Sequence, residues 1–376
     1  MTALSTLPKL PVQQLGPGPQ EVALTVGPAT RRARRAVSMA DVAAHAQVSQ
    51  KTVSRVVNGE PHVREEVRLR VGAAIRDLDY RPNAAARSLV TRRTRRIGVV
   101  ALGTSLYGPR SALTALESVA RADGYSLSIR RTEDTGRDRI QSAIDSLLGE
   151  GIEGLVLSEP MQLEGPPLRV RSDVAVLTLG GVQLTGQEDE ILVGADEHSG
   201  GRLATEHLIG LGHRTVHHLA GPAAWVSSRL RREGWEEVLV EHGAAVPPIE
   251  TGDWSPRSGH AAMTRLLEQS PAPTAVFVAN DQMAIGAISA LAAHGLSTPE
   301  DVSVVGFDDI DVSEFQPTPL TTIRQEFSRS ALQGMNQLIH AIDGETPEEL
   351  HHRVPVSFAH RATTAPPLDP RTSTAR

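Results

Sequence analysis

The feature that most constrains the fold is an alternation, from Ile97 onward, between short apolar runs and longer amphipathic stretches. The runs have the length of strands, and the stretches between them have room for crossover helices. Eight runs have this character, at residues 97–102, 125–129, 154–158, 174–180, 191–195, 215–221, 274–280 and 302–309. Spread over some 270 residues, they predict two doubly wound parallel-sheet subdomains with a cleft between them, rather than one very wide sheet.

Polar side chains follow some of these runs where the strand would end. Asn280-Asp281 and Asp308-Asp309 are the clearest cases. The carboxyl ends of parallel strands are where such folds bind ligands, so these residues predict a site in the cleft. The sequence has neither G-x-G-x-x-G after a strand nor G-x-x-x-x-G-K-[ST], and we therefore expect no nucleotide cofactor and no cofactor of another kind.

Residues 38–59 read SMADVAAHAQVSQKTVSRVVNG and predict a helix-turn-helix. Ser38 and Asp41 form a capping-box pattern for the first helix, Ser49 is a cap for the second, and Gly59 ends it. Valines repeat at helical spacing on the inner face, which leaves polar donors outside: Gln50, Lys51, Ser54 and Arg55. Such donors suit base edges and phosphates in a major groove. On this pattern alone, an ordinary helical hairpin is an equal alternative.

A third amphipathic pattern, at residues 64–79, completes a three-helix headpiece, and Tyr80-Arg81-Pro82 interrupts it. The alanine-rich residues 83–89 would form a helix shorter than the ~12 to 15 residues at which an isolated helix becomes marginal in water. We therefore predict that it forms only when something holds it. The predicted domains are a disordered extension (1–36), the headpiece (37–81), a hinge helix and linker (82–96), a two-subdomain body (97–364) and a flexible tail (365–376), with fraying from Thr363.

Charge divides the chain into two parts of opposite sign. Residues 31–96 hold sixteen Lys and Arg against six Asp and Glu, whereas residues 97–376 hold twenty-one against thirty-seven. A basic segment joined to an acidic body is typical of a protein that touches nucleic acid with one end. The chain has no cysteine, no apolar run of membrane-spanning length and no signal-peptide pattern at its start. We expect a cytoplasmic protein without a membrane partner.

Residues 37–97 closely resemble the DNA-binding headpiece and hinge of the lactose/galactose repressor family of bacterial transcription regulators, with TVSRVVNG, YRPNAAARSL and RRIGVV in the family's order. The resemblance continues to about Thr364. There it is most similar to lactose-repressor-type members, through LAGP, VSSRLRREGW, GDWS, VANDQMAIGA, SVVGFDD and PLTTIRQEF. It implies an all-α headpiece followed by a periplasmic-binding-protein-like effector body.

The resemblance also implies a homodimer whose headpieces bind a palindromic operator. Gln50, Lys51 and Arg55 match base-reading positions. Phosphate or positioning contacts are implied for Ser49, Thr52, Ser54, Asn58 and His62, although each is equally explained as a cap or surface group. In the hinge, Asn83, Ala86 and Leu89 match DNA-contacting positions, and Leu89 matches a wedge that enters the minor groove. The chain lacks a C-terminal leucine heptad, so we expect a dimer and no tetramer.

In the body, the resemblance places the sugar-binding residues at Arg231, Trp254, Asn280, Asp308 and Gln325. Their chemistry suits a sugar, because forked donors and acceptors pair adjacent hydroxyls while an indole covers the C–H face. Trp225 and Trp235 match no such role, and we interpret both as structural.

Two positions depart from the family. Where lactose-repressor-type proteins have an aspartate facing the sugar, this chain has Leu179-Gly180-Gly181, which removes a hydroxyl acceptor. Arg64 replaces the usual Ser or Thr cap of the third headpiece helix, at an expected cost of ~1 kcal/mol.

The favoured hypothesis is a repressor of a carbohydrate-use operon that leaves its operator when a sugar binds. Three alternatives remain: a co-repressor-dependent regulator of the same family, a transport-type sugar-binding protein and an enzyme. The last lacks a recognisable nucleophile or oriented base. A metal site is also disfavoured, because the paired histidines at 217–218 and 351–352 have no helical i, i+4 spacing with a carboxylate.

Overall fold

The computed structural model describes residues 37–81, 93–102, 106–132, 136–158, 161–269, 272–347 and 349–368. The chain divides into two compact units, Met1–Asn83 and Ala84–Arg376, and each is described by itself. The predictions for the N-terminal extension and for Asn83, Ala86 and Leu89 of the hinge lie outside the described residues.

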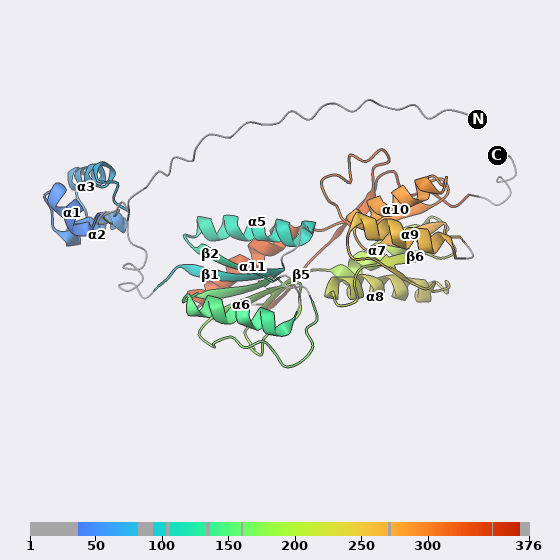
Figure 1. The fold of residues 1–376 in the computed structure, drawn as a ribbon, viewed down its shortest axis with the longest axis horizontal. Coiled ribbons are helices and arrows are strands. Elements are labelled where there is room, and N and C mark those ends of the chain that lie inside the picture. The colour runs from blue at the N-terminus through green and yellow to red at the C-terminus, as the bar shows by residue number, and fades with distance from the viewer. Residues whose placement is uncertain are drawn as a thin grey trace, which may run out of the picture. The chain divides into compact units, whose positions relative to one another are not determined.

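The first unit holds a three-helix headpiece made of α1 (Met39–His45), α2 (Gln50–Val57) and α3 (Glu65–Asp77) (Figure 1). Val42, Val53 and Val71, one from each helix, are fully buried in its core. This core is small, and it buries the valine face that the helical spacing predicted.

The helix ends follow the sequence patterns. Ser38 and Asp41 form the capping box of α1, and the Ser49 hydroxyl accepts from the amide of Thr52 at 3.2 Å to cap α2. Gln47 has φ of 52° in the turn between these helices. Arg64 begins α3 without a side-chain cap, as predicted, and Glu65 and Glu66 occupy the first turn, where carboxylates favour the helix dipole.

The second unit contains two six-stranded sheets. The first sheet has the order β11 (His351–Val354), β5 (Ile191–Ala195), β4 (Ala175–Leu179), β3 (Gly154–Ser158), β1 (Arg96–Leu102), β2 (Ser126–Thr132). The second has the order β12 (Ser357–Ala359), β10 (Thr321–Arg324), β9 (Ser303–Asp308), β8 (Ala275–Val278), β6 (His217–Ala220), β7 (Glu250–Thr251). All neighbouring strands are parallel except β10 and β12. We call the sheets with their helices the N-subdomain and the C-subdomain.

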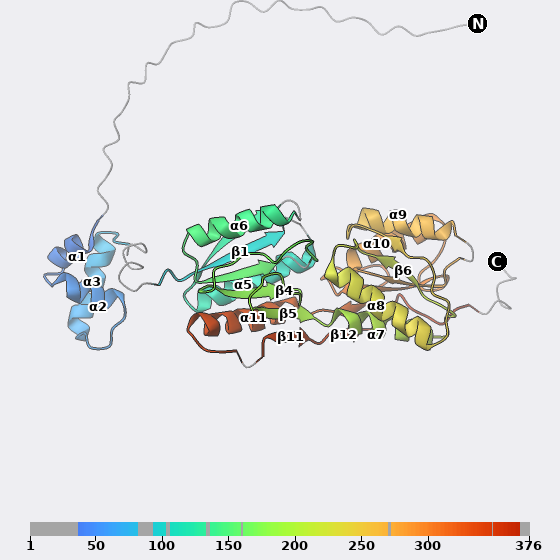
Figure 2. The same ribbon diagram turned by 90° about the horizontal axis from the view of Figure 1, so that it is seen from below.

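Helices cover both faces of each sheet (Figures 1 and 2). In the N-subdomain, α5 (Tyr107–Ala122) and α11 (Phe327–Ile342) pack on one face and α6 (Arg137–Gly149) on the other. In the C-subdomain, α7 (Glu197–Gly210) and α8 (Val226–Glu241) share one face, and α9 (Pro256–Leu267) and α10 (Asp281–Ala293) share the other. This is the doubly wound arrangement that the alternating runs predicted.

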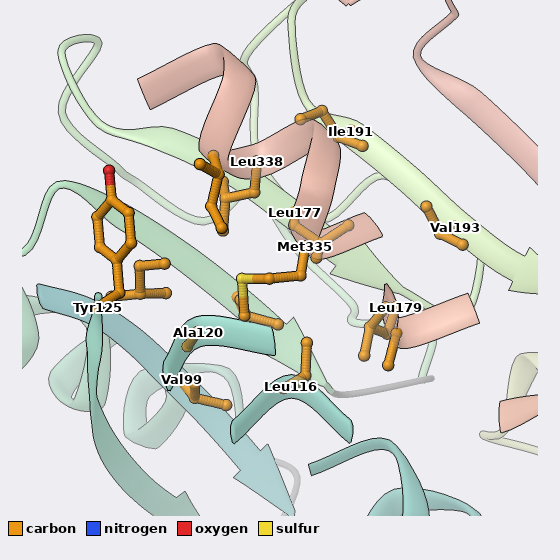
Figure 3. Packing of buried hydrophobic residues seen from close by; sticks show 14 of the residues in the cluster. Val99, Leu116, Ala120, Tyr125, Leu177, Leu179, Ile191, Val193, Met335 and Leu338 are labelled. Atoms are coloured by element: carbon orange, nitrogen blue, oxygen red, sulfur yellow. The ribbon is translucent and has the colours of Figure 1, made fainter. Parts of the chain in front are cut away.

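The N-subdomain core reaches the end of its sheet. Figure 3 shows Leu116 and Ala120 of α5 and Met335 of α11 against the strands, with Leu179 and Val193 in the same cluster. Leu179 and Val193 also line a cavity, described below, so the core and the cavity share a wall.

All eight predicted strands are present, and four further strands were not predicted: β7, β10, β11 and β12. The chain passes between the subdomains three times, after β5, after β10 and after β11. Contacts also bridge the subdomains away from these crossings. Met161 forms an isolated antiparallel bridge with Trp225, and the Tyr107 hydroxyl donates to Asp311 at 3.2 Å.

Both ends of the body differ from the predicted boundaries. The prediction that the chain frays from Thr363 was wrong at that residue: Thr363 is fully buried, and its hydroxyl donates to the Val304 carbonyl at 2.7 Å. Ala365 is held through its amide by Ser303, whereas residues 369–376 lie outside the described part. At the other end, Arg93 binds Glu153 and Asp343, so residues predicted as linker already contact the N-subdomain.

Candidate DNA-binding surface and effector cavity

Helix α2 presents the three side chains matched to base reading. Gln50, Lys51 and Arg55 are all exposed, and Arg55 pairs with the exposed Glu60 at 3.4 Å. An exposed pair of this kind contributes ~0–1 kcal/mol, so Arg55 is readily released to another anion. The charge and exposure of this face suit contact with nucleic acid.

The residues matched to phosphate or positioning contacts have local partners. Ser49 and Thr52 share a hydroxyl hydrogen bond of 2.9 Å within the cap of α2, and the Asn58 amide donates to Ser54 at 3.3 Å. His62 is exposed beyond the helix. Ser49 and Thr52 thus fix the N-terminus of the helix that carries Gln50 and Lys51, and Asn58 caps its C-terminal end.

A cavity lies between the two subdomains, at the carboxyl ends of their strands. It encloses about 850 Å³ of space, counting the solvent at its opening. The five predicted effector residues all line it: Arg231, Trp254, Asn280, Asp308 and Gln325.

Arg231 is the centre of the polar side of the cavity. Its side chain is buried, and its Nε donates to Glu197 at 2.7 Å while another nitrogen lies 3.4 Å from Asp308. It also donates to the carbonyl of Ala279, and the guanidinium lies 3.7 Å from the ring centroid of Phe307. Two carboxylates, a carbonyl and an aromatic face thus hold one buried cation in a fixed orientation, as buried charges require.

Asp308 ends β9 in an unusual backbone conformation, with φ of 109°. Burial raises the pKa of its carboxyl to about 7, and the Arg231 charge beside it opposes that shift. Gln325 donates to the same carboxyl oxygen at 2.7 Å. Asp308 therefore lies in the cavity wall as the acceptor of both Gln325 and Arg231.

Trp254 also has positive φ, of 74°, although it is not glycine. Such a backbone costs ~1–3 kcal/mol and persists only where the surroundings enforce it. Asn280, which caps α10, donates to the Trp254 carbonyl at 3.2 Å, and Gly221 lies so close under the indole that a Cβ there would be 2.3 Å from its ring. The indole Nε1 of Trp254 is buried and has no hydrogen-bond partner in the described structure.

The N-subdomain side of the cavity is mostly apolar. Its lining comes from the start of α5, the ends of β4 and β5, and the first turns of α11, with Leu179, Val193 and Phe327 as examples. Among the lining residues that the structure describes, none from this subdomain carries a charge. Gly180, just after β4, has φ of 106°. A Cβ added at Gly194 of β5 would lie 2.9 Å from the Gly181 amide nitrogen, so the end of β4 and β5 contact each other through backbone atoms alone.

Sequence reasoning missed several lining residues. Trp225 was interpreted as structural, yet it is half-buried and lines the cavity; Trp235 is in the core, with its Nε1 donating to Val216 at 2.9 Å. Other lining residues that were not predicted are Tyr107, Glu197, Ser227, Gln282 and Phe327. Glu197 follows a predicted strand closely, and the strand-end rule that selected Asn280 would also have found it.

Within the described ranges, no group of three or more His, Asp or Glu side chains is arranged to hold a metal ion. No helix in that part of the chain is long and apolar enough to cross a membrane.

A helix-turn-helix headpiece followed by a two-subdomain parallel-sheet body defines a class of DNA-binding transcription regulators. The chain belongs to the lacI family of bacterial regulatory proteins. The model of that family matches residues 38–83, and that of the periplasmic binding protein-like domain matches residues 205–364. The lactose operon repressor of Escherichia coli K12 is 34% identical over 339 residues, which are 90% of this chain and 93% of the relative. That relative is a transcriptional repressor, and this chain is a DNA-binding transcriptional repressor of the same family.

Other relatives and solved structures are also similar to this chain. The HTH-type transcriptional repressor PurR of Histophilus somni is 34% identical over 82% of this chain and 93% of its own length. Among solved structures, the lac repressor dimer bound to operator and the anti-inducer ONPF has a TM-score of 0.78 at 33% identity and covers 88% of this chain and 100% of its own. A complex of the regulator CelR with cellobiose has a TM-score of 0.63 at 28% identity, over 87% of this chain and 99% of that one.

Proposed function

We propose that the protein represses a carbohydrate-utilisation operon and that a sugar bound in the cavity releases it from a palindromic operator. The observation that carries the proposal is the convergence of Arg231, Asp308, Asn280 and Gln325 beside the indole of Trp254. Together they offer paired donors and acceptors and a flat apolar surface, which are the two features that a pyranose ring requires.

The cleft position gives the sugar a means of acting on the headpiece. A ligand that touches both subdomains stabilises one arrangement of them over another, and the linker at residues 82–96 would respond to that arrangement. Since operator and sugar then favour different arrangements, each must weaken the binding of the other by the same factor.

Gel shifts on the DNA upstream of the protein's own gene, with a panel of mono- and disaccharides, test this function. We expect binding to a palindrome at low salt and release by one sugar of the panel. Absence of any bound palindrome would contradict DNA recognition there. Tighter operator binding on addition of a ligand would show the opposite sign and establish the co-repressor alternative.

We also propose that the protein binds its operator as a homodimer. The C-subdomain carries two exposed apolar side chains on one loop, Phe315 at 81% exposure and Val312 at 51%. The similar lac repressor structure, a dimer bound to operator, is the main support for the proposal. Sedimentation at micromolar concentration should give the mass of a dimer, and a tetramer would contradict the proposal.

A further inference from the structure

Arg93 lies within residues 82–96, which the sequence predicted as hinge and linker, and its side chain holds the end of this segment on the N-subdomain. Its Nε donates to Glu153 at 2.8 Å, and a terminal nitrogen donates to the Tyr125 hydroxyl at 2.7 Å. Both terminal nitrogens donate to one carboxylate oxygen of Asp343, at 2.9 and 3.0 Å. One guanidinium thus joins three elements, because Tyr125 precedes β2, Glu153 precedes β3 and Asp343 caps the C-terminus of α11.

Glu153 also holds the two residues that follow Arg93. One of its carboxylate oxygens accepts from the Arg95 amide at 2.8 Å and from the Thr94 hydroxyl at 3.3 Å. The Arg95 guanidinium in addition lies over the Tyr125 ring, 5.0 Å from its centroid. The three residues before β1 are therefore fixed to the sheet by side chains that precede its neighbouring strands.

Asp343 differs from the other two partners because it belongs to a helix that reaches the effector cavity. Helix α11 has 16 residues, which at 1.5 Å per residue gives a length of about 24 Å. Phe327 and Ala331 in its first two turns line the cavity, and Asp343 caps its opposite end. Between these ends, Met335 is fully buried against the sheet (Figure 3). Helix α11 therefore connects the cavity wall to Arg93 without an intervening loop.

Of the two carboxylates that bind Arg93, Asp343 is held less firmly. The Arg93 and Asp343 side chains are 34% and 44% exposed, whereas Glu153 is 14% exposed. An ion pair between partly exposed groups contributes little and requires good geometry, whereas a more buried pair is screened less by water. A small shift of α11 along the sheet would lengthen the hydrogen bonds to Asp343 and leave those to Glu153 in place.

We propose that Arg93 and Asp343 are positioning residues for operator binding. Their ion pair fixes the end of the linker to the C-terminus of α11, and the repressor binds its operator in the arrangement in which this pair is formed. A ligand that displaces α11 from the cavity side breaks the pair and weakens operator binding, by no more than the pair contributes. The inference rests on the proposed release of the operator by a ligand, and it holds whether or not that ligand is a sugar.

Operator affinities of full-length variants test the proposal, measured by fluorescence anisotropy at several salt concentrations on a palindrome from upstream of the protein's own gene. Asp343→Asn should weaken binding about 3- to 10-fold, the range for one partly exposed charged hydrogen bond. Arg93→Gln should weaken it at least as much. Both variants should keep the wild-type salt dependence, because neither side chain binds a phosphate. Glu345→Gln is the matched control, since it removes a carboxylate that pairs only with the exposed His340 among the described contacts, and it should change affinity by less than about twofold.

The sign of the Asp343→Asn effect separates positioning from direct DNA contact. If Arg93 bound a phosphate itself, Asp343→Asn would release it and tighten operator binding, and Arg93→Gln would make the salt dependence shallower by about 0.9 in log affinity per log salt. Either result overturns the proposal, as does an affinity within twofold of wild type for both variants.

The double variant tests the pair itself. If the two side chains act through one interaction, Arg93→Gln with Asp343→Asn should bind operator no more weakly than Arg93→Gln alone, and additive losses would contradict the pair. Stoichiometric titration at high protein concentration counts the binding-competent molecules, so that a loss of fold is distinguished from a loss of affinity. If the wild type binds no palindrome there, the proposed function fails and this inference fails with it.

Discussion

The two subdomains have sheets with corresponding strand orders, yet they supply opposite chemistry to the cavity between them. The C-subdomain contributes Glu197, Arg231 and Asp308, together with amide side chains and two tryptophans. The N-subdomain contributes mostly aliphatic side chains, Phe327 and bare glycine backbone, and its polar side chains there are uncharged: Tyr107, Ser158 and Ser330. Similar topology therefore places ligand-lining residues at corresponding sheet edges without determining what those residues are.

This division implies different tasks for the two sides. Hydrogen-bonding groups on the C-subdomain would select the ligand, because an unpaired buried polar group costs more than a poorly filled apolar surface. The mostly apolar side would transmit ligand binding to the N-subdomain, because three of its lining residues, Leu179, Val193 and Ala331, belong to the core of that subdomain.

The largest effect is expected from Arg231→Ala. Removing the guanidinium leaves Glu197 and Asp308 buried without their cation, which should lower the free energy of unfolding by ~3–5 kcal/mol. Sugar affinity should fall by about 100-fold or more, roughly the loss of two charge-assisted hydrogen bonds. Arg229→Ala is the matched control on the same helix. Its pair with Glu233 is exposed, so less than ~1 kcal/mol should be lost. Equal effects for the two variants would contradict the central role of Arg231.

Phe327→Ala tests the apolar side. The ring packs edge-on to Tyr107 at 5.8 Å and covers Gly108, so its loss should cost about 2 kcal/mol, less than for a fully buried phenylalanine. Chemical denaturation measures this cost. Sugar affinity should fall by less than in Arg231→Ala. A greater fall would show that recognition is shared by both sides.

Asp308→Asn tests the pH dependence of the polar side. The pKa of Asp308 in the folded protein is about 7, above its unfolded value of ~3.9, so its contribution to stability is present at low pH and lost as pH rises through about 7. Between pH 6 and 8 the wild type should lose about 1 kcal/mol of unfolding free energy from this group. The variant should lack that decline when both are unfolded in urea across the range. Parallel pH profiles would show that Asp308 stays charged in the folded state.

The smallest effect is expected from Ser330→Ala. Ser330 brings a hydroxyl from α11 to the N-subdomain side. If that side recognises shape alone, sugar affinity should change by less than about twofold, and unfolding by less than ~0.5 kcal/mol because alanine is the better helix former. A tenfold loss of affinity would contradict the division, because it would show that the N-subdomain side also recognises the ligand by a hydrogen bond.

Central strands were predictable from the sequence, and edge strands were not. The run at 154–158 became β3, whose five residues are all buried, because a strand covered on both faces is apolar throughout. By contrast, β11 is an edge strand with exposed histidines and arginine, and it pairs with β5, far earlier in the chain. Neither the strand β11 nor its pairing with β5 can be predicted from the local sequence. The two-residue β7 is too short to leave a pattern.

The cavity shows the same limit. Arg231 was predicted through the family resemblance, and Asp308 also because it ends an apolar run, where parallel-sheet folds bind ligands. Leu179 and Val193 could not be recognised as cavity residues from the sequence, because the same apolar residue types line a cavity and fill a core. The place of Trp225 in the cavity lining, against Trp254, could not be predicted either, because it depends on the fold.

Gly180 and Gly194 also limit how this protein can change its ligand during evolution. At Gly194 any side chain would collide with the neighbouring backbone, and at Gly180 a substitution must adopt φ of 106°, which other residues rarely tolerate. No single mutation can therefore introduce a carboxylate at either position without displacing a strand. Substitutions that change ligand specificity should therefore arise on the C-subdomain side of the cavity, and the N-subdomain side should stay unchanged among proteins that bind different ligands.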